Sequence, residues 1–456
     1  MNTAKKSLMT ILLSGLFLLL GLIIWNSYSL IKGNPLPEHT LVPASSVVAP
    51  PSITPKPIED PNSDETFYEG EGQTATMRLS VFGDIVVHTG INFEARTDDE
   101  TGYDYAKIFP DAAEQFRNAD YAVGCIETTF PEGLDYDGYP LFRTPEQLAK
   151  GLADSGVDML NTASNHSLDS WKSGLDRTLD ILDKYEVEHV GTYRTQEERD
   201  ENAGFRIVER NGIKIAFGAY TYGTNGLPLN NDTYAVNVFT SDYMTTISDV
   251  KYDMMKEDIA VAKTLGADII AVWMHWGNEY EIRSNKMQDD IADFLFQEGV
   301  DIILGGHTHV PQPMETRIIE DGDGNTRVGF IMYSLGNFLS CQNDKYTDLT
   351  AIVNIDIEKN LDTGKIRFSN IEYVPMYMVD LYDFNIMADW RYRLWNVNEA
   401  IADIESGYDR GIITSELSDA IYQAKEDLNR ILGPETDIHK RHLGEDTVTD
   451  GEDAES

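Results

Sequence analysis

The sequence predicts an α/β fold with a largely parallel sheet. Short apolar runs, typical of buried strands, alternate along the chain with amphipathic stretches at helical spacing. The clearest strand, Ile302–Leu304, is followed by Gly305 and Gly306, which permit a tight turn, and Pro311 and Pro313 prevent its continuation. Polar residues follow five of the strands at their carboxyl ends, where open α/β sheets bind ligands.

The predicted elements alternate from residue 77 onward. Strands are predicted at residues 77–82, 120–126, 157–163, 214–220, 268–274, 302–304 and 329–337. Helices are predicted at residues 111–119, 145–155, 174–185, 254–265 and 287–298. Residues 349–357 and 365–374 alternate like antiparallel strands joined by a turn. Residues 387–432 have helical spacing, which indicates two helices packed against the sheet.

The N-terminal region differs in composition from the rest. Lys5 and Lys6 precede an uncharged apolar run, Leu8–Trp25, extendable to Tyr28. This length predicts a transmembrane anchor at residues 8–28, with residues 1–7 cytoplasmic and the folded domain extracellular at the cell membrane. A cleavable signal peptide is the alternative, but no small-x-small cleavage site follows closely.

Two further segments are predicted to lack regular structure. Residues 29–76 are rich in Pro, Ser, Thr and acidic residues, which predicts a disordered extracellular linker. A domain at residues 77–380 follows, then a helical C-terminal segment at residues 381–433 and an acidic, disordered tail at residues 434–456.

The net charge and the number of cysteines argue against a nucleic-acid-binding protein and against a disulfide-stabilised scaffold. The formal net charge of −41 argues against a nucleic-acid partner, because phosphate contacts need Lys and Arg. Cys125 and Cys341 are too few for a disulfide framework. Buried free thiols are therefore expected, with a single bridge between the two as the alternative.

Metal-binding residue types follow the predicted strands. His307 and His309 would point the same way in an extended chain. Two carboxylates, an amide oxygen and several imidazoles suit two divalent metal ions such as Mn, Fe or Zn. The alternatives are that Asn165 caps the helix predicted at residues 174–185 and that the histidines are ordinary loop residues. The candidate ligands at the strand ends are Asp84, Glu127, Asn165, His275, His307 and His309.

Six short motifs occur in order between about residues 77 and 379. They are Gly83-Asp84, Glu127-Thr128, Ser164–Asp169, His275–Tyr280, Gly306–His309 and Tyr333–Phe338. The ordered set resembles the CapA capsule synthesis family (poly-γ-glutamate biosynthesis, PGA_cap), which is related to calcineurin-like metallophosphoesterases. The resemblance implies a four-layer α/β/β/α metallophosphatase-like sandwich with two metal ions between the loops of the two sheets.

The resemblance also implies individual roles. Asp84, Glu127 and His309 would hold one ion, and Glu127 would bridge to a second ion held by Asn165, His275 and His307. His166 would be the general acid that protonates the leaving group. Three departures from the family pattern are Val86, where a His is usual, Cys125, where an Asn is usual, and Ser164, where the first Asn of Asn-Asn-His is usual. His88, two residues after Val86, could substitute for the missing His, with a role beside the ligands or at the surface as the alternative. Residues expected beside the ligands are His88, Asp169, Glu279, Ser334 and Asn337.

The function expected from these features is that of a membrane-tethered extracellular metallohydrolase acting on an envelope polymer or a phosphoester. The alternative is a non-catalytic scaffold of a capsular polymer synthesis and export complex. A third interpretation is a module that binds a cationic or metal-loaded wall polymer. The expected partners are the capsular or poly-γ-glutamate polymer, its membrane synthase and export proteins, and the membrane through the N-terminal helix.

Overall fold

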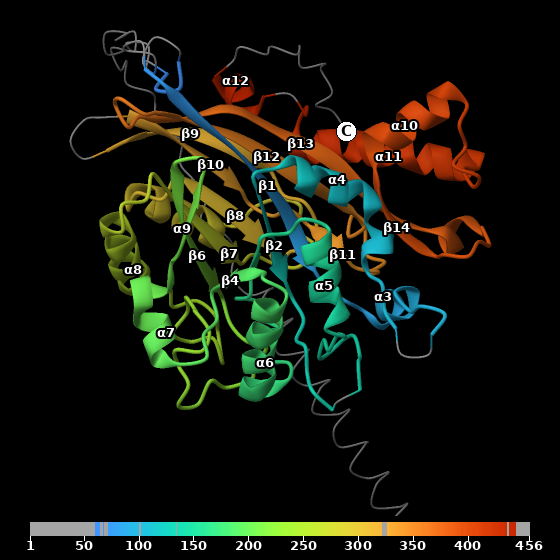
Figure 1. Cartoon of the computed structure of the whole chain (residues 1–456), viewed down its shortest axis with the longest axis horizontal. Coiled ribbons are helices and arrows are strands. Elements are labelled where there is room, and N and C mark those ends of the chain that lie inside the picture. Colours follow the sequence, from blue (N-terminus) through green and yellow to red (C-terminus); the bar gives the residue numbers. More distant parts are fainter. Residues whose placement is uncertain are drawn as a thin grey trace, which may run out of the picture. The chain divides into compact units, whose positions relative to one another are not determined.

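Two mixed β-sheets form the centre of the molecule (Figure 1). The structure, a computed structural model, describes residues 60–63, 67, 72–99, 102–133, 135–321, 326–435 and 437–443. The first sheet has the strand order β14 (Tyr392–Asn396), β13 (Ile366–Asp380), β12 (Leu349–Asn360), β1 (Thr74–Ile85), β2 (Tyr121–Ile126), β3 (Met159–Asn161) and β4 (Glu188–Val190), and β11 (Asn337–Leu339) pairs with β1. The second has the order β5 (Arg206–Arg210), β6 (Ile213–Thr221), β7 (Ile269–His275), β8 (Ile302–Gly306), β10 (Thr326–Met332) and β9 (Met314–Glu320).

Each sheet has a parallel part that is extended by antiparallel strands. Strands β1 to β4 are parallel in the first sheet. Strands β6, β7, β8 and β10 are parallel in the second. The carboxyl ends of parallel strands lie at one edge of a sheet, so polar residues that follow different strands are brought close together.

Helices cover the outer faces of the sheets, α4 and α5 on one side and α8 and α9 on the other in Figure 1. The longer connecting helices are α4 (Pro110–Asn118), α5 (Gln147–Asp154), α6 (Trp171–Lys184), α8 (Tyr252–Thr264) and α9 (Lys286–Gln297). The shorter ones are α3 (Thr89–Glu94) and α7 (Gln196–Asp200), with 3₁₀ turns at Ala106–Ile108, Glu201–Gly204 and Leu381–Phe384. The C-terminal region adds α10 (Val397–Ser406), α11 (Ser415–Leu432) and α12 (Ile438–Leu443).

Three apolar clusters separate four layers, because the buried strands present apolar side chains on both faces. In β7, Ala271 and Trp273 face the cluster between the sheets, whereas Val272 and Met274 face the one under α8 and α9. In β1, Leu79 packs between the sheets. The outer cluster of the first sheet lies against α4 and α5. The predicted α/β fold is confirmed.

The predicted elements agree with the observed ones except at the sheet margins. The central strands and the five longer helices lie where the sequence pattern placed them. Residues 381–433 are not wholly helical, because Tyr392–Asn396 forms β14 and extends the first sheet. The short strands β4 and β5 and the edge strand β9 were not predicted.

The boundaries predicted at both ends of the domain need correction. Residues 74–76 belong to β1, and the Asn62 side chain donates a hydrogen bond to the carbonyl of Phe368 at 3.0 Å, so the linker does not extend to residue 76 as predicted. Part of the predicted disordered tail forms α12, where His439 Nε2 lies 3.0 Å from Asp60 Oδ2. These contacts join positions far apart in the chain, which local composition cannot reveal.

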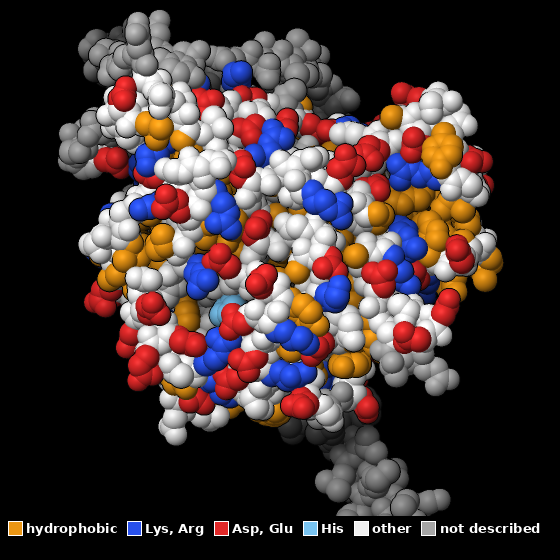
Figure 2. Space-filling view, viewed as in Figure 1, with side chains coloured by type: hydrophobic (Ala, Val, Ile, Leu, Met, Phe, Trp, Pro, Cys, Tyr) orange, Lys and Arg blue, Asp and Glu red, His pale blue; other side chains and the backbone are white. Residues whose placement is uncertain are grey.

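The predicted transmembrane anchor at residues 8–28, the linker up to residue 59 and the end of the tail lie outside the described residues. Among the residues that are described, no helix combines the length and apolarity needed to cross a membrane. Acidic and basic side chains are interspersed on the face shown in Figure 2, and apolar side chains gather near α10 and α11. Cys125 and Cys341 are both free thiols, and Cys125 is fully buried.

Candidate metal centre

The candidate ligands come from both sheets and meet at the carboxyl ends of the parallel strands. Asp84 is near the end of β1, and Glu127 follows β2 directly. On the other sheet His275 ends β7, and His307 follows β8. All four side chains are at most 5% exposed. The structure therefore brings together residues from two halves of the chain.

Two carboxylates and one imidazole form the first group. Ligand atoms of Asp84, Glu127 and His309 all lie within 4.8 Å of one another. Asp84 Oδ2 accepts a hydrogen bond from the backbone N–H of His307 at 2.7 Å. Burial raises the pKa of Asp84, and burial together with the charge of Asp84 raises the pKa of Glu127 well above its ordinary value. A cation between the two carboxylates would offset this unfavourable charge.

An amide and two imidazoles form the second group, which adjoins Glu127. His275 Nε2 lies 2.7 Å from Asn165 Oδ1 and 3.7 Å from Glu127 Oε2. The centroids of the His275 and His307 rings are 4.9 Å apart. Burial lowers the pKa of His275 far below its ordinary value and that of His307 to about 3, so both rings are neutral near pH 7. Neutral imidazole is the form that binds metals.

Glu127 lies between these two groups. It shares the first group with Asp84 and His309, and one of its oxygens faces His275 and the second. This position agrees with the bridging role that the family resemblance implies. The role itself stays a prediction.

The backbone after β8 corrects one sequence argument. The strand ends at Gly306, and His307 and His309 both have left-handed backbone angles, with φ of 92° and 62°. They therefore do not converge through the alternation of an extended strand, as predicted, but through a tight bend. Such angles are costly for residues other than glycine, and they persist where the surrounding structure enforces them.

Gly306 gives Asp84 the space it occupies. A Cβ atom added at Gly306 would lie 2.3 Å from Asp84 Oδ1. We expect Gly306→Ala to displace the Asp84 carboxylate and to weaken metal binding by about tenfold or more, as loss of ligand support does elsewhere. Titration with Mn²⁺ followed by calorimetry measures this. Gly223→Ala is the control, because the added Cβ meets no atom closer than 3.4 Å; equal losses in both variants would contradict the expectation.

His166 lies beside the second group, where it is held by a carboxylate. Its Nδ1 lies 2.8 Å from Asp169 Oδ2, which also accepts the backbone N–H of Phe142 at 2.5 Å. The ring packs edge-on against Phe142, with centroids 4.6 Å apart. Asp169 thus fixes the ring and leaves Nε2 available. The alternative role for Asn165 is wrong, because the N-cap of α6 is Ser170.

The other residues predicted near the centre divide into two kinds. Asn337 Oδ1 lies 3.0 Å from His309 Nδ1 and can orient that ring, whereas Glu279 Oε1 lies 3.8 Å from Nε2, the nitrogen that is left to bind a metal. His88 lies outside the ligand groups, with its Nδ1 3.1 Å from the carbonyl of Val86 and 3.3 Å from Ser340 Oγ. Ser334 accepts the backbone N–H of Gly336 and contributes to a turn.

Three residues near the centre were not among the predicted site residues. The Tyr222 ring packs on His307, with centroids 4.6 Å apart, and Asn225 contacts both Asn165 and His166. Both lie in the loop after β6, which shows no periodic pattern. Cys125 Sγ lies 4.0 Å from His275 Nδ1 and accepts a hydrogen bond from Asn161 Nδ2 at 3.2 Å.

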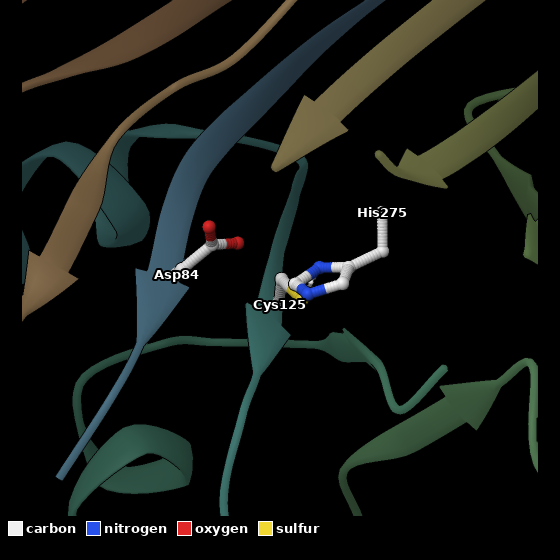
Figure 3. A group of neighbouring side chains, drawn as sticks. All are labelled: Asp84, Cys125 and His275. Atoms are coloured by element: carbon white, nitrogen blue, oxygen red, sulfur yellow. Dashed lines mark hydrogen bonds between the residues drawn. The ribbon is translucent and has the colours of Figure 1, made fainter. Parts of the chain in front are cut away.

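Figure 3 shows Asp84 and Cys125 on neighbouring strands, with His275 reaching toward them from the other sheet. Burial raises the pKa of the Cys125 thiol, so it is neutral near pH 7 when no metal is nearby. The thiol lies on the Nδ1 side of His275, and Asn165 and Glu127 lie on the Nε2 side. The Cys125 sulfur is thus placed to accept a hydrogen bond from Nδ1–H of His275 while Nε2 binds a metal.

The residues present fit a pair of divalent ions. Four side-chain atoms at the centre are buried yet have no hydrogen-bond partner among the described residues: Asp84 Oδ1, Glu127 Oε1, Glu127 Oε2 and His307 Nδ1. Buried polar atoms are otherwise almost always paired, and each of these four is of a type that binds metals. Carboxylate, imidazole and amide donors together favour Mn, Fe or Zn.

Comparison with known proteins places the chain in a family. Residues 78–342 match the family described as Bacterial capsule synthesis protein PGA_cap, and this match covers more than half of the chain. The chain belongs to this family. It is 28% identical over 299 residues to PGA biosynthesis protein CapA of Bacillus subtilis (strain 168), which covers 65% of this chain and 71% of that protein. It is 25% identical over 267 residues to Capsule biosynthesis protein CapA of Bacillus anthracis, which covers 57% of this chain and 59% of that protein.

Solved structures give looser matches to this PGA_cap family member. Calcineurin-like phosphoesterase YfkN from Bacillus subtilis aligns over 77% of this chain and 100% of its own, with 13% identity and a TM-score of 0.38. A novel phosphatase from Mycoplasma pneumoniae aligns over 66% and 94%, with 15% identity and a TM-score of 0.36. Superpositions this loose do not bear on function, which therefore has to be inferred from the side chains at the centre.

Proposed function

We propose that this PGA_cap family member is an extracellular, membrane-tethered hydrolase with two divalent metal ions, acting on phosphoester bonds of an envelope polymer or of its precursors. One observation supports the proposal above all. Two buried carboxylates, an amide oxygen and three imidazoles lie together, and several of their ligand atoms have no protein partner. When bound, the ions supply Lewis-acid activation of a phosphoryl oxygen and of water.

The side chains at the centre have three roles in the proposed reaction: they hold the ions, donate a proton and orient the ligands. Asp84, Glu127 and His309 would hold one ion, and Asn165, His275 and His307 would hold the other. His166 Nε2 is placed to give a proton to the departing oxygen, because Asp169 holds Nδ1 of the same ring. Asn337 orients His309. Enclosure by both sheets keeps bulk water from the ligand atoms and strengthens their electrostatic effect.

The chemistry of the ligand set favours phosphoesters. A pair of divalent ions held by these residues would supply the charge stabilisation that the attacking and leaving oxygens of a phosphoryl transfer need. The polymer in question would be the capsular polymer, and the partners would be its membrane synthase and export proteins. Those assignments follow from family membership, since the residues at the centre do not identify a polymer.

The decisive experiment combines metal analysis with turnover of a generic phosphodiester, bis-p-nitrophenyl phosphate. We expect purified protein to bind two Mn²⁺, Fe or Zn ions and to hydrolyse the diester. His307→Ala should lower turnover about 10²-fold or more, because it removes one ligand of the second ion. His189→Ala is the control, since His189 lies on β4 and pairs with Asp183. Protein that binds no divalent ion, or His307→Ala with wild-type turnover, would contradict the proposal.

A second candidate function is a metal-stabilised scaffold of the polymer export machinery. The nearly complete burial of the ligands favours it, because structural metal sites are closed whereas catalytic sites keep an open position. Under this alternative, the His307→Ala protein would still support capsule formation in cells whenever it folds. Loss of capsule by a folded, turnover-deficient variant supports the hydrolase instead.

A further inference from the structure

Asn225 connects a proposed metal ligand with the proposed general acid. Its side-chain oxygen accepts a hydrogen bond from Asn165 Nδ2 at 3.1 Å, and its side-chain nitrogen lies 3.3 Å from His166 Nε2. The two residues that it contacts are buried, whereas Asn225 itself is exposed in the loop after β6. It therefore reaches the centre from the solvent side.

The backbone of this loop favours asparagine at position 225. Its φ of 48° is left-handed, a region in which asparagine is several-fold enriched over most other residues. The preceding residue, Thr224, is fully buried, and its hydroxyl donates to the carbonyl of Leu227 at 2.6 Å. The loop thus holds Asn225 in place by its own hydrogen bonds.

The contact with Asn165 decides which end of that amide faces the metal position. The Asn225 oxygen is an acceptor, so it pairs with the nitrogen end of the Asn165 amide and turns the oxygen end toward His275 Nε2, 2.7 Å away. An amide turned the other way would present an N–H group, which has no lone pair for a metal ion. Asn225 can therefore control whether Asn165 is able to act as a ligand.

The contact with His166 involves the same amide group. Asp169 engages Nδ1 of His166 at 2.8 Å, which fixes one side of the ring. The Asn225 nitrogen lies 3.3 Å from Nε2 and 3.5 Å from Nδ1 of the ring, and Tyr222 Oη donates to the Asn225 oxygen at 3.4 Å. The oxygen of Asn225 thus takes two donors and its nitrogen faces the imidazole, so one side chain sets the geometry of both residues.

We propose that Asn225 is a positioning residue that directs the Asn165 oxygen to the second metal ion and fixes the orientation of the His166 ring beside it. The inference rests on the proposed hydrolase function. It concerns the chain's own hydrogen bonds, so metal binding tests it independently of turnover.

Two substitutions separate the two contacts. Asn225→Asp keeps an oxygen acceptor for Asn165 but removes the N–H groups that face His166. Asn225→Ala removes both contacts. Asn230→Ala is the matched control, because Asn230 is also exposed, lies five positions away and has a similar φ of 53°, while its side chain bonds the carbonyl of Pro228. It measures the cost of alanine in a left-handed backbone alone.

The first measurement is titration of metal-free protein with Mn²⁺ by calorimetry. We expect Asn225→Ala to lower the affinity for one of the two ions about 10- to 100-fold, the usual effect of removing a residue that orients a metal ligand. Asn225→Asp and Asn230→Ala should keep both affinities within about threefold of wild type, by the same reasoning. The second measurement is turnover of bis-p-nitrophenyl phosphate, where Asn225→Ala and Asn225→Asp should both lower kcat while KM stays nearly unchanged.

The experiments distinguish failure of the proposed hydrolase function from failure of the positioning role of Asn225. If wild-type protein binds no divalent ion, the proposed function fails first. If wild type binds two ions and Asn225→Ala binds both equally tightly, the positioning role is overturned while the hydrolase proposal stands. Equal losses in Asn230→Ala would also overturn it, because they would show an effect of the backbone alone.

Discussion

Replacing Glu127 with glutamine is expected to abolish binding of both metal ions and to lower phosphodiester turnover by about 10³-fold or more. Glu127 is fully buried, and its two oxygens have no hydrogen-bond partner among the described residues. It faces His275 in one group and shares the other with Asp84. A neutral amide in its place would leave each ion without its central negative ligand. The loss of several kcal/mol of charge stabilisation corresponds to the stated factor.

The same substitution should stabilise the metal-free protein. Without a cation, burial beside Asp84 makes the folded protein hold a proton on Glu127, which costs free energy above the ordinary pKa of the group. Glutamine keeps the shape and removes this cost. We expect an increase of about 1–3 kcal/mol in the free energy of unfolding, the range for a buried group without partners. Urea unfolding in chelator measures it. The control is Glu320→Gln, at an exposed position on β9, which should change neither metal binding nor the free energy of unfolding. A Glu127→Gln protein that retains two ions would refute the assignment of Glu127 as a metal ligand.

Divalent ions should stabilise the wild-type protein more at pH 8 than at pH 5. At an ion concentration about a hundredfold above Kd, each ion adds about 2.7 kcal/mol to the free energy of unfolding. Protons compete for the ligands, so this gain shrinks as the pH falls. His307, with a pKa of about 3, is neutral at both pH values, and the pKa of His275 is also far below its ordinary value. The competing protons therefore bind to Glu127 and Asp84, whose pKa values are raised.

In the metal-free protein, Glu127 and His307 change the free energy of unfolding in opposite directions as the pH rises. The raised pKa of Glu127 means that the folded state holds a proton that the unfolded chain releases above about pH 4.5. This contribution to stability is present at low pH and is lost as the pH rises through the raised pKa. The lowered pKa of His307 destabilises the folded state as the pH falls below 6.5, because only the unfolded chain takes up the proton.

Thermal unfolding of wild type and Glu127→Gln across pH 5 to 8, with Mn²⁺ and with chelator, tests both statements. The difference between the two metal-free proteins should grow as the pH rises. Stabilisation by Mn²⁺ that is equal at pH 5 and pH 8 would show that the buried carboxylates are not the ligands. Asp242→Asn is a control for the pH series. Hydrogen bonds from Thr246 and Ser248 lower the pKa of Asp242, which lies on the surface, so its charge does not change between pH 5 and pH 8.

The sequence was informative where strand and ligand are adjacent. Asp84, Glu127 and His275 each end or directly follow an apolar run, so their meeting at one sheet edge was predictable from the order of elements. The four layers followed from family resemblance, because apolar runs alone do not show that the strands divide between two sheets. The structure explains why the strands form two sheets, because Trp273 and Val272 of one strand pack into different apolar clusters on its two faces.

What escaped prediction depends on contacts between distant positions or on irregular backbone. Asn225 lies 60 residues from Asn165 and comes from a loop without periodic pattern. His439 and Asp60 are separated by 379 positions, and each was assigned to a disordered segment on composition alone. The left-handed backbone at His307 and His309 could not be predicted either, because non-glycine residues rarely adopt it.

The division of ligands between the two sheets has a consequence for kinetics. Asp84 and Glu127 belong to the first sheet, and His275 and His307 belong to the second. An ion held by residues from both would act as a cross-link between layers that are otherwise joined at this edge by apolar packing and by hydrogen bonds such as that from the His307 N–H to Asp84. The sheets could then separate only after the ion dissociates, so metal loading should slow the unfolding rate and protect the protein from proteolysis.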